Sequence, residues 1–393
     1  MANVSSSNGI EKYPKLRFQG FTIPWTEIEI GKAFQVTRGY VLPATVVRQD
    51  ASEEYIYPVY SSQTKDNGLM GYYNDYLYEN AITWTTDGAN AGTVHYRPGK
   101  FYCTNVCGVL LSDEGNANRC VAEILGSISK KYVSYVGNPK LMNNVMSEIK
   151  IYVPTIAEQK KIDEFISVID HRIEKQRELI EHLKKYKRGV VKTLLDPKQN
   201  QRQGVIWTTD TIGKLGTFIK GAALSKADIS DFGTPFVLYG ELYTTYKEVV
   251  RSIVRATQAS VDDVYLSKVG DVVIPTSGET PEEISTASCI MVPDVILAGD
   301  LNIYRSTIVD GRIMSYLLNH IVNEQIARVA QGKSVVHVQA TEVGKISITY
   351  PDHNEQERIA QILELIDNRI AVSEKALNSM QMMKKALLQQ LFI

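Results

Sequence analysis

One helical phrase occurs twice in this chain, and this repeat restricts the possible folds more than any other feature of the sequence. EQKKIDEFISVIDHRI occupies residues 158–173, and EQERIAQILELIDNRI occupies residues 355–370, 197 positions later. An ungapped alignment of residues 154–195 with residues 351–392 contains ten identities. Because an internal repeat marks a repeated structural unit, the chain is predicted to be a duplication, in which a globular segment and a long helix occur twice.

Both long helices carry an apolar seam with the 4-3 spacing of a coiled coil. A polar residue interrupts each seam at the same place, Gln176 in the first helix and Ser373 in the second, and a lysine follows at Lys187 and Lys384. The spacing predicts that each helix packs along this seam. The seam residues are Ile162, Ile166, Ile169, Ile173, Gln176, Ile180 and Leu183 in the first helix, and Ile359, Leu363, Ile366, Ile370, Ser373, Leu377 and Met380 in the second.

The length of the helices indicates how the seams are covered. About forty helical residues form a rod of roughly 60 Å, which one small domain cannot bury. We therefore expect the two helices to form an antiparallel coiled coil, because each globular segment then lies at the start of its own helix without crowding the other. This arrangement relates the halves by a pseudo-twofold axis. A homodimeric coiled coil that uses the same seams is the alternative.

The segments before the helices predict an α+β fold with a curved, mostly antiparallel sheet in each half. Amphipathic helices are expected near residues 118–136 and 311–330, and a short strand then leads into each long helix. Strand-like runs rich in Tyr, Val and Ile occupy residues 53–62, 80–86, 93–111, 234–250, 270–277 and 287–298. The predicted domains are two globular domains at 1–150 and 196–349, a central long helix at 151–195 and a C-terminal long helix at 350–393.

Composition excludes several classes of protein. A chain of 393 residues with 44% hydrophobic side chains can form two separate cores. No apolar run approaches the roughly 18 residues of a membrane span, and the opening MANVSSSNGI has neither a basic nor an apolar signal region. We therefore expect a cytoplasmic protein without membrane contact. The four cysteines suit no disulfide framework, and no Cys or His spacing suits a metal site, so no metal is predicted.

Catalytic motifs are missing from the sequence. It contains no GxxxxGK[ST] phosphate loop, no HExxH and no GxSxG. The glycine-rich TTDGANAG at residues 85–92 follows a strand without opening a helix, which is typical of a turn. The lone NPK at residues 138–140 is not an amino-methyltransferase motif. We therefore predict a non-catalytic protein with no catalytic residues and no cofactor of its own.

Several loops combine amides and cations with aromatic residues, which suits nucleic-acid binding. Arg and Lys suit phosphates or guanine edges, and Asn and Gln suit adenine edges. Each residue alone is more often an ordinary loop residue, and the net charge of −1 means that a DNA-binding face must come from local arrangement. The predicted DNA-binding residues are Gln63, Lys65, Asn67, Asn90, Arg97, Tyr239, Tyr243, Lys247, Gln331, Lys333 and Ser334.

Nearly the whole chain resembles the specificity subunit of type I restriction-modification systems. The resemblance is carried by the opening PKLRFQGF with Trp25 downstream, the phrase of residues 154–191, its second copy, and the ending KKALLQQLF. It implies two target recognition domains that each read one half of an asymmetric bipartite DNA target. It also implies that the two helices set the gap between the half-sites.

The resemblance implies partners as well. They are double-stranded DNA, two methyltransferase subunits that modify adenine N6, and restriction subunits that join through the complex. S-adenosylmethionine, ATP and Mg are expected on those partner subunits, which explains why this chain lacks catalytic motifs. A structural coiled-coil adaptor that joins two protein-binding domains without DNA is the alternative function.

Overall fold

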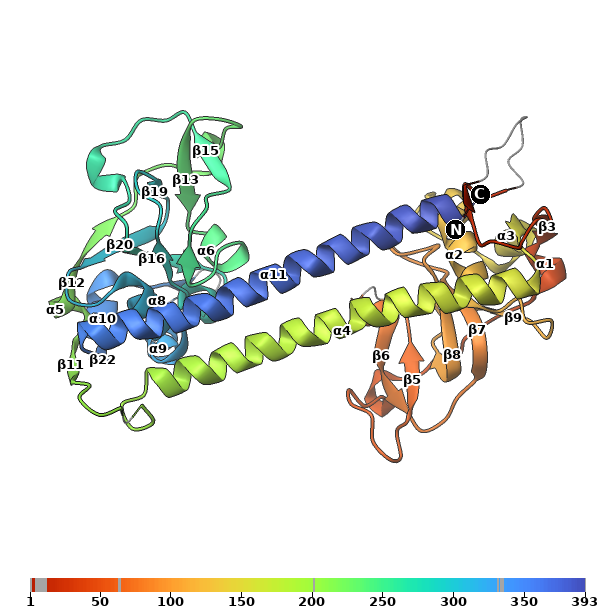
Figure 1. The fold of residues 1–393 in the computed structure, drawn as a ribbon, viewed down its shortest axis with the longest axis horizontal. Helices are drawn as coiled ribbons and strands as arrows, with labels where there is room; N and C mark the ends of the chain where they lie inside the picture. Colours follow the sequence, from red (N-terminus) through yellow and green to blue (C-terminus); the bar gives the residue numbers. More distant parts are fainter. Residues whose placement is uncertain are drawn as a thin grey trace. The chain divides into compact units, whose positions relative to one another are not determined.

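The computed structural model describes residues 2–3, 13–62, 65–200, 202–330, 332 and 336–392. The chain forms two compact units: Met1–Arg177 with Lys375–Ile393 make the first, and Glu178–Glu374 make the second. Each unit contains one α+β domain and a segment of both long helices, α4 (Ile156–Leu194) and α11 (His353–Leu391) (Figure 1). The division falls inside the helices, and the domain boundaries expected from the sequence stay a prediction.

The first unit is built on a six-stranded sheet in the order β4-β9-β7-β8-β5-β6, in which only β5 and β8 are parallel neighbours. Helix α2 packs on β8, and an antiparallel pair of β3 and β10 leads into α4. The elements are β1 (Ala2–Asn3), β2 (Leu16–Arg17), β3 (Thr26–Glu29), α1 (Ile30–Ala33), β4 (Gln35–Arg38), η1 (Ala44–Val46), β5 (Tyr57–Tyr60), η2 (Lys65–Gly68), β6 (Leu69–Tyr73), β7 (Tyr78–Thr85), β8 (Val94–Cys103), β9 (Cys107–Leu111), α2 (Arg119–Ile128), η3 (Ser129–Tyr132), α3 (Asn143–Glu148) and β10 (Lys150–Val153).

The second unit contains a five-stranded sheet, β12-β20-β16-β18-β14, and a three-stranded sheet, β15-β13-β19. Only the β13-β19 and β14-β18 neighbours are parallel among its described strands. The elements are β11 (Trp207–Thr211), α5 (Ile212–Leu215), β12 (Gly216–Lys220), η4 (Lys226–Asp228), β13 (Thr234–Leu238), α6 (Glu241–Thr244), β14 (Val249–Val250), β15 (Arg255–Thr257), η5 (Asp263–Tyr265), β16 (Asp271–Pro275), β17 (Ser277–Gly278), α7 (Pro281–Ile284), β18 (Ser288–Ile290), β19 (Ile296–Ala298), β20 (Leu301–Ser306), α8 (Gly311–His320), α9 (Asn323–Val329), β21 (Val336–His337), α10 (Ala340–Lys345) and β22 (Ser347–Pro351).

Both long helices take part in the core of each domain. In the first unit, Ile162 near the start of α4 lies in the same apolar cluster as Trp84 of β7, and Phe392 beyond the end of α11 packs against that cluster. In the second unit, the order is exchanged: Val191 near the end of α4 and Ile359 near the start of α11 share one cluster. The helices are therefore antiparallel within each unit, and the predicted α+β fold class is confirmed.

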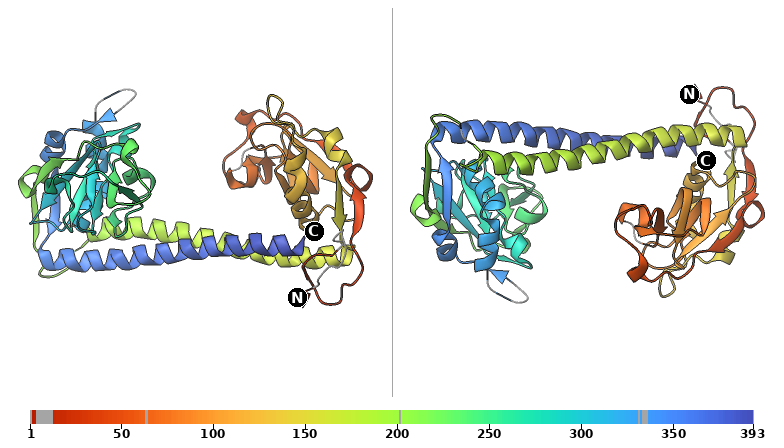
Figure 2. Two further views of the ribbon diagram at one scale, coloured as in Figure 1. Left: turned by 90° about the horizontal axis from the view of Figure 1, so that it is seen from above. Right: turned by 90° about the horizontal axis from the view of Figure 1, so that it is seen from below.

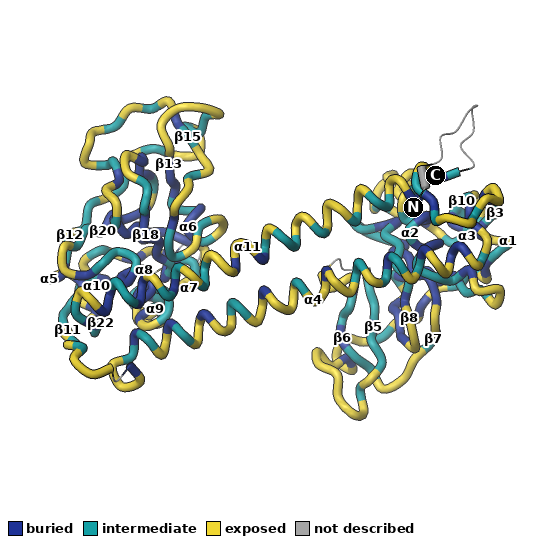
Figure 3. Tube along the Cα trace, viewed as in Figure 1, coloured by how far each residue is buried: buried dark blue, intermediate teal, exposed yellow. Residues whose placement is uncertain are grey.

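The expected seam residues lie on buried or half-buried positions of α4 and α11 throughout. Figure 3 shows the buried positions recurring along both helices between exposed ones, as an amphipathic stripe requires. Within each unit the two helices run side by side in both views of Figure 2. None of the helices in the described ranges combines the length and the apolar character that crossing a bilayer requires.

The repeated Glu-Gln pair of the helical phrase anchors the start of each long helix. Gln159 Nε2 donates to the carbonyl oxygen of Pro154 at 2.9 Å, and Gln356 Nε2 makes the same 2.9 Å bond to Pro351. The buried carboxylate of Glu158 accepts two hydrogen bonds from Arg17, at 2.7 and 2.6 Å. Since these side chains are buried at the junction of domain and helix, the phrase fixes the direction in which each helix leaves its domain.

Three element predictions were wrong in detail because tertiary contacts override local pattern. The strand expected over residues 234–250 ends at Leu238, where the buried Glu241 accepts a hydrogen bond from the backbone and begins α6. The helix expected over 118–136 ends at Ile128, because the Ser129 hydroxyl donates to the carbonyl oxygen of Gly92. The helix expected over 311–330 is divided into α8 and α9, with Ile321 and Val322 between them.

Candidate nucleic-acid interface

Three loops of the first unit lie together at one edge of its sheet. Asn90 Nδ2, in the turn after β7, donates to the carbonyl oxygen of Ser62 at 3.0 Å. The same turn holds a third loop, because Gly88 N donates to Pro139 O and Leu141 N donates to Thr86 O, each at 2.9 Å. The described residues of three loops, 61–62 with 65–68, 86–92 and 130–141, therefore form one connected surface.

Lys65 and Asn67 are exposed on this surface, in the short turn η2. Asp66 and Asn67 have φ values of 50° and 55°, in the left-handed region that Asp and Asn adopt more readily than most residues. Asn90 is half-buried, and its amide braces two loops. Gln63 lies outside the described residues.

Arg97 was expected in a loop, but it lies within β8 and is only 5% exposed. Its Nε donates to Thr83 Oγ1 at 3.1 Å, and its guanidinium lies 3.7 Å from the centre of the Tyr60 ring. Burial lowers the pKa of Arg97, although the cation persists because an arginine pKa begins so high. The stacked guanidinium therefore braces the sheet beneath the loops, and its predicted DNA contact stays a prediction.

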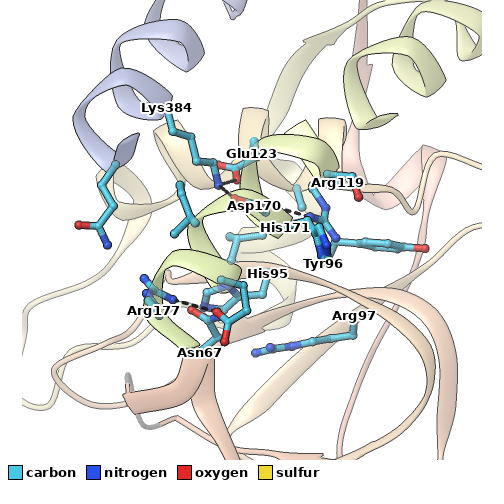
Figure 4. A pocket seen from close by; sticks show the side chains of 16 residues that line it. Asn67, His95, Tyr96, Arg97, Arg119, Glu123, Asp170, His171, Arg177 and Lys384 are labelled. Atoms are coloured by element: carbon cyan, nitrogen blue, oxygen red, sulfur yellow. Dashed lines mark hydrogen bonds and ion pairs between the residues drawn. The ribbon is translucent and has the colours of Figure 1, made fainter. Parts of the chain in front are cut away.

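A cleft of about 600 Å³ in the first unit is lined by residues of β8, α2 and both long helices (Figure 4). Arg119 binds Asp170 at 2.8 Å, and Lys384 binds Glu123 at 3.0 Å and Asp170 at 2.8 Å. Burial, together with the nearby cations, lowers the pKa of His95 to about 4, so its imidazole is neutral at physiological pH. These ion pairs join α2 to both long helices and so hold the domain on its helices.

In the second unit, Tyr239 and Tyr243 are half-buried and line a groove of about 840 Å³, together with Lys226 and Arg255. Burial raises the pKa of Tyr243, so its phenol stays protonated and can donate a hydrogen bond. Lys247 is exposed but binds Glu374 of α11 at 3.0 Å, which ties the loop to the helix. The predicted residues Gln331, Lys333 and Ser334 lie outside the described residues.

The sequence prediction missed the loop of residues 130–141. Its tip carries Tyr135 and Val136, which are 70% and 92% exposed. The repeat contains a signal that identifies this loop: the offset of 197 that relates α3 to α10 also relates residues 134–140 to 331–337. Directly after these two segments, Val338 N donates to Thr276 O as Leu141 N does to Thr86 O.

A metal centre is not formed in the described part of the chain, where no group of three His, Cys, Asp or Glu side chains is placed to hold an ion. The four cysteines are buried and unpaired, and burial raises the pKa of the Cys107 thiol to about 11, so it is not a reactive thiolate.

Two α+β domains, each packed on both long helices, define a class of protein that is built by duplication within one chain. The family model described as the type I restriction modification DNA specificity domain matches the chain twice, at residues 22–185 and 205–381. The chain therefore belongs to the family of type I restriction-modification DNA specificity proteins.

Curated relatives and solved structures are similar to this chain. The type I restriction enzyme MpnII specificity subunit of Mycoplasma pneumoniae is 31% identical over 38% of this chain and 45% of its own length. The matches thus span about half the length of the Mycoplasma relatives. The MjaVIII specificity subunit of Methanocaldococcus jannaschii is 23% identical over 95% of this chain and 93% of its own.

Among solved structures, the type I restriction-modification S subunit from M. genitalium has a TM-score of 0.63 at 17% identity, covering 97% of this chain and 99% of its own. A chain from a structure of type I R-M complex assembly has a TM-score of 0.52 at 13% identity, covering 94% and 96%. At these identities the likeness is one of fold.

Proposed function

We propose that this chain is the non-catalytic specificity subunit of a type I restriction-modification complex. Its two domains read an asymmetric bipartite DNA target and position two adenine-N6 methyltransferase subunits, which in turn bind the restriction motor subunit. The observation that carries the proposal is that the two domains share one arrangement of strands and helices but differ in their loops. Residues 135–137 (Tyr-Val-Gly) and 332–334 (Gly-Lys-Ser) correspond at the offset of 197, and their side chains differ in chemistry.

Unlike loops on a common frame suit two unlike half-sites. A symmetric dimer of one domain reads a palindrome, because both half-sites meet the same side chains. Two domains with different loops in one chain meet different bases. In the first unit the exposed Lys65 and Asn67 supply a phosphate-binding cation and an adenine-binding amide.

The outer faces of the helices support docking of two copies of a partner. Val168 in α4 and Leu365 in α11 are equivalent in the repeat, as are Tyr186 and Met383, and each side chain is more than half exposed. The first unit therefore carries Val168 and Met383, and the second carries Leu365 and Tyr186. Exposed apolar residues at repeated positions fit one methyltransferase subunit per unit.

The proposal assigns chemistry to the partners. S-adenosylmethionine, ATP and Mg bind there, and this chain acts in the cytoplasm with its DNA. Co-expression with a neighbouring methyltransferase gene, followed by genome-wide mapping of N6-methyladenine, tests this function. We expect one bipartite methylated motif that disappears when the specificity gene is deleted.

A result without any bipartite motif that depends on this chain contradicts the proposal. The adaptor alternative is separated by a gel shift of the assembled complex on its mapped motif against scrambled DNA. An adaptor binds both DNAs equally or neither of them.

A further inference from the structure

In the first unit, the hairpin of residues 130–141 has apolar side chains at its tip and lysines where it joins the domain. Tyr135 and Val136 stand next to each other at the tip and are 70% and 92% exposed. Lys130 and Lys131 are exposed at the base and make no ion pair with any described residue. No acidic residue occurs in residues 129–140.

The hairpin is held firmly, although its tip touches little. Ser134 N donates to Lys140 O at 2.8 Å and Lys140 N donates to Ser134 O at 2.9 Å, which closes the loop. Gly137 has a φ of +76° at the tip, where the chain must reverse and where most side chains are strained. The loop is therefore preorganised, so that little conformational entropy is lost when the tip binds.

The base of the hairpin is packed into the domain. Leu141 is fully buried, and its carbonyl oxygen accepts a hydrogen bond from Trp84 Nε1 at 3.0 Å. Gly92, with a φ of +80°, allows the close approach, because an added Cβ would lie 2.8 Å from Val133 Cγ2. The tip is thus rigidly connected to the turn that carries Asn90, next to the loop with Lys65 and Asn67.

We propose that this hairpin is a DNA wedge: Tyr135 and Val136 enter a groove and unstack one base step, while Lys130 and Lys131 hold the adjacent phosphates. The inference rests on the proposed function and adds shape readout to it. Apolar side chains inserted between stacked base pairs kink the DNA. Because some base-pair steps are more flexible than others, the energy of the kink depends on the DNA sequence even without hydrogen bonds to the bases. Lys130 and Lys131 favour DNA over a protein partner, because phosphates complement unpaired lysines.

The test uses the chain purified with its methyltransferase partner and duplexes of the mapped target, each with 2-aminopurine at one position. 2-Aminopurine brightens when its base is unstacked. 2-Aminopurine that replaces the target adenine brightens when the methyltransferase flips that base, so this position reports an intact complex. We expect a second bright position in one half of the target with the wild-type chain.

The double variant Tyr135→Ala with Val136→Ser is expected to lose the second bright position, keep the flipped adenine, and bind the target about tenfold more weakly. Val136→Leu, which keeps an apolar tip, retains the bright position. Ile206→Ser removes an equally exposed apolar side chain far from the hairpin in sequence and leaves binding unchanged. Because all these side chains are exposed, thermal melting of each variant should match the wild type.

Three results overturn the wedge while the proposed function stands. The first is wild-type binding to the motif with no bright position besides the flipped adenine. The second is a double variant that behaves as the wild type. The third is a double variant that no longer co-purifies with the methyltransferase, because the hairpin is then a protein-docking surface. If the wild-type complex binds no specific motif, the proposed function fails and the wedge fails with it.

Discussion

Lys384 Nζ in α11 lies 2.8 Å from the carboxylate of Asp170 in α4, and the same pair recurs 197 positions away, where Lys187 Nζ lies 2.6 Å from Asp367. All four residues are identical between the two copies of the phrase. Each pair joins the two helices within its own unit. The lysines that interrupt the apolar seams therefore join the two helices to each other.

Each of these lysines also binds its domain. Lys384 binds Glu123 of α2 at 3.0 Å, and Lys187 binds Glu248 before β14 at 2.7 Å. One ammonium group therefore ties three segments together: the two helices and the globular domain of the unit.

Lys187→Ala is expected to destabilise the second unit by about 3 kcal/mol, because it leaves the largely buried carboxylates of Glu248 and Asp367 without their shared cation. The urea midpoint followed by circular dichroism, with hydrogen exchange to locate the change, measures this loss. Lys185→Ala, at an exposed neighbouring position, is the control and should leave the midpoint unchanged. If both variants shift the midpoint equally, the three-way contact does not stabilise the fold.

Glu248 makes the stability of the second unit depend on pH in the acid range. Burial acts to raise the pKa of Glu248, but the 2.6 Å hydrogen bond to His320 and the Lys187 ammonium outweigh burial and hold this pKa at about 2. Because the folded pKa lies below the unfolded one, the stabilisation is complete above about pH 5 and is lost as the pH falls toward 2. Over this range Glu248 makes the free energy of unfolding fall by up to about 1.4 kcal/mol per pH unit. We expect Glu248→Gln to remove this contribution to the slope.

Unfolding by urea at a series of pH values between 5 and 2.5 measures this slope. Glu282→Gln changes an exposed carboxylate in the same unit and should keep the wild-type slope. A wild-type slope in the Glu248→Gln protein would show that the acid sensitivity comes from other groups.

The sequence predicted the helices and the interruptions of their seams, since periodicity and repetition are local signals. It did not predict what the lysines bind. Glu123 lies in α2 and Glu248 lies before β14, at places that are not equivalent in the repeat, so no spacing identifies them. Their meeting with Lys384 and Lys187 depends on how each domain packs on its helices, which is decided by tertiary structure.

The candidate interface was predictable only in part for the same reason. Asn67 and Lys65 stand in a turn with a recognisable sequence, and the structure exposes them. Arg97 lies beside Pro98 and Gly99, which indicate a loop, yet β8 continues through them with a bulge opposite Asn80 and buries the arginine against Tyr60. Tyr135 and Val136 are typical strand residues, so composition gave no reason to place them at an exposed tip.

Lys65 and Asn67 are expected to affect DNA binding in different ways. Lys65→Ala should weaken binding to all sequences and reduce the slope of binding against salt by about 1, because it removes a cation that contacts phosphate. Asn67→Ala should relax the preference at one base pair, at a cost of about 1–3 kcal/mol for the correct base. Binding of the assembled complex to the mapped motif and its single-base variants measures both effects.

The control for these variants is Lys214→Ala, because Lys214 is not among the predicted DNA-binding residues. Its ammonium binds Asp210 at 3.2 Å, and its loss is expected to leave the salt slope unchanged. If the wild-type and Lys65→Ala complexes have equal salt slopes, Lys65 does not contact a DNA phosphate.

Lengthening both long helices by one heptad is expected to change the gap in the target and leave the bases of both half-sites unchanged. Seven residues add about 10 Å to a helix, which equals about 3 base pairs of DNA. Insertions between residues 178 and 179 and between 375 and 376 are equivalent in the repeat. A heptad also preserves the phase of the seam, so the helices can pair as before. Mapping of N6-methyladenine in cells that carry the lengthened chain gives the new motif.

A seven-residue insertion in the loop of residues 197–203 is the control and should leave the gap unchanged, since that loop follows α4. If the lengthened helices change the bases that are read and keep the gap, the helices do not set the spacing of the half-sites.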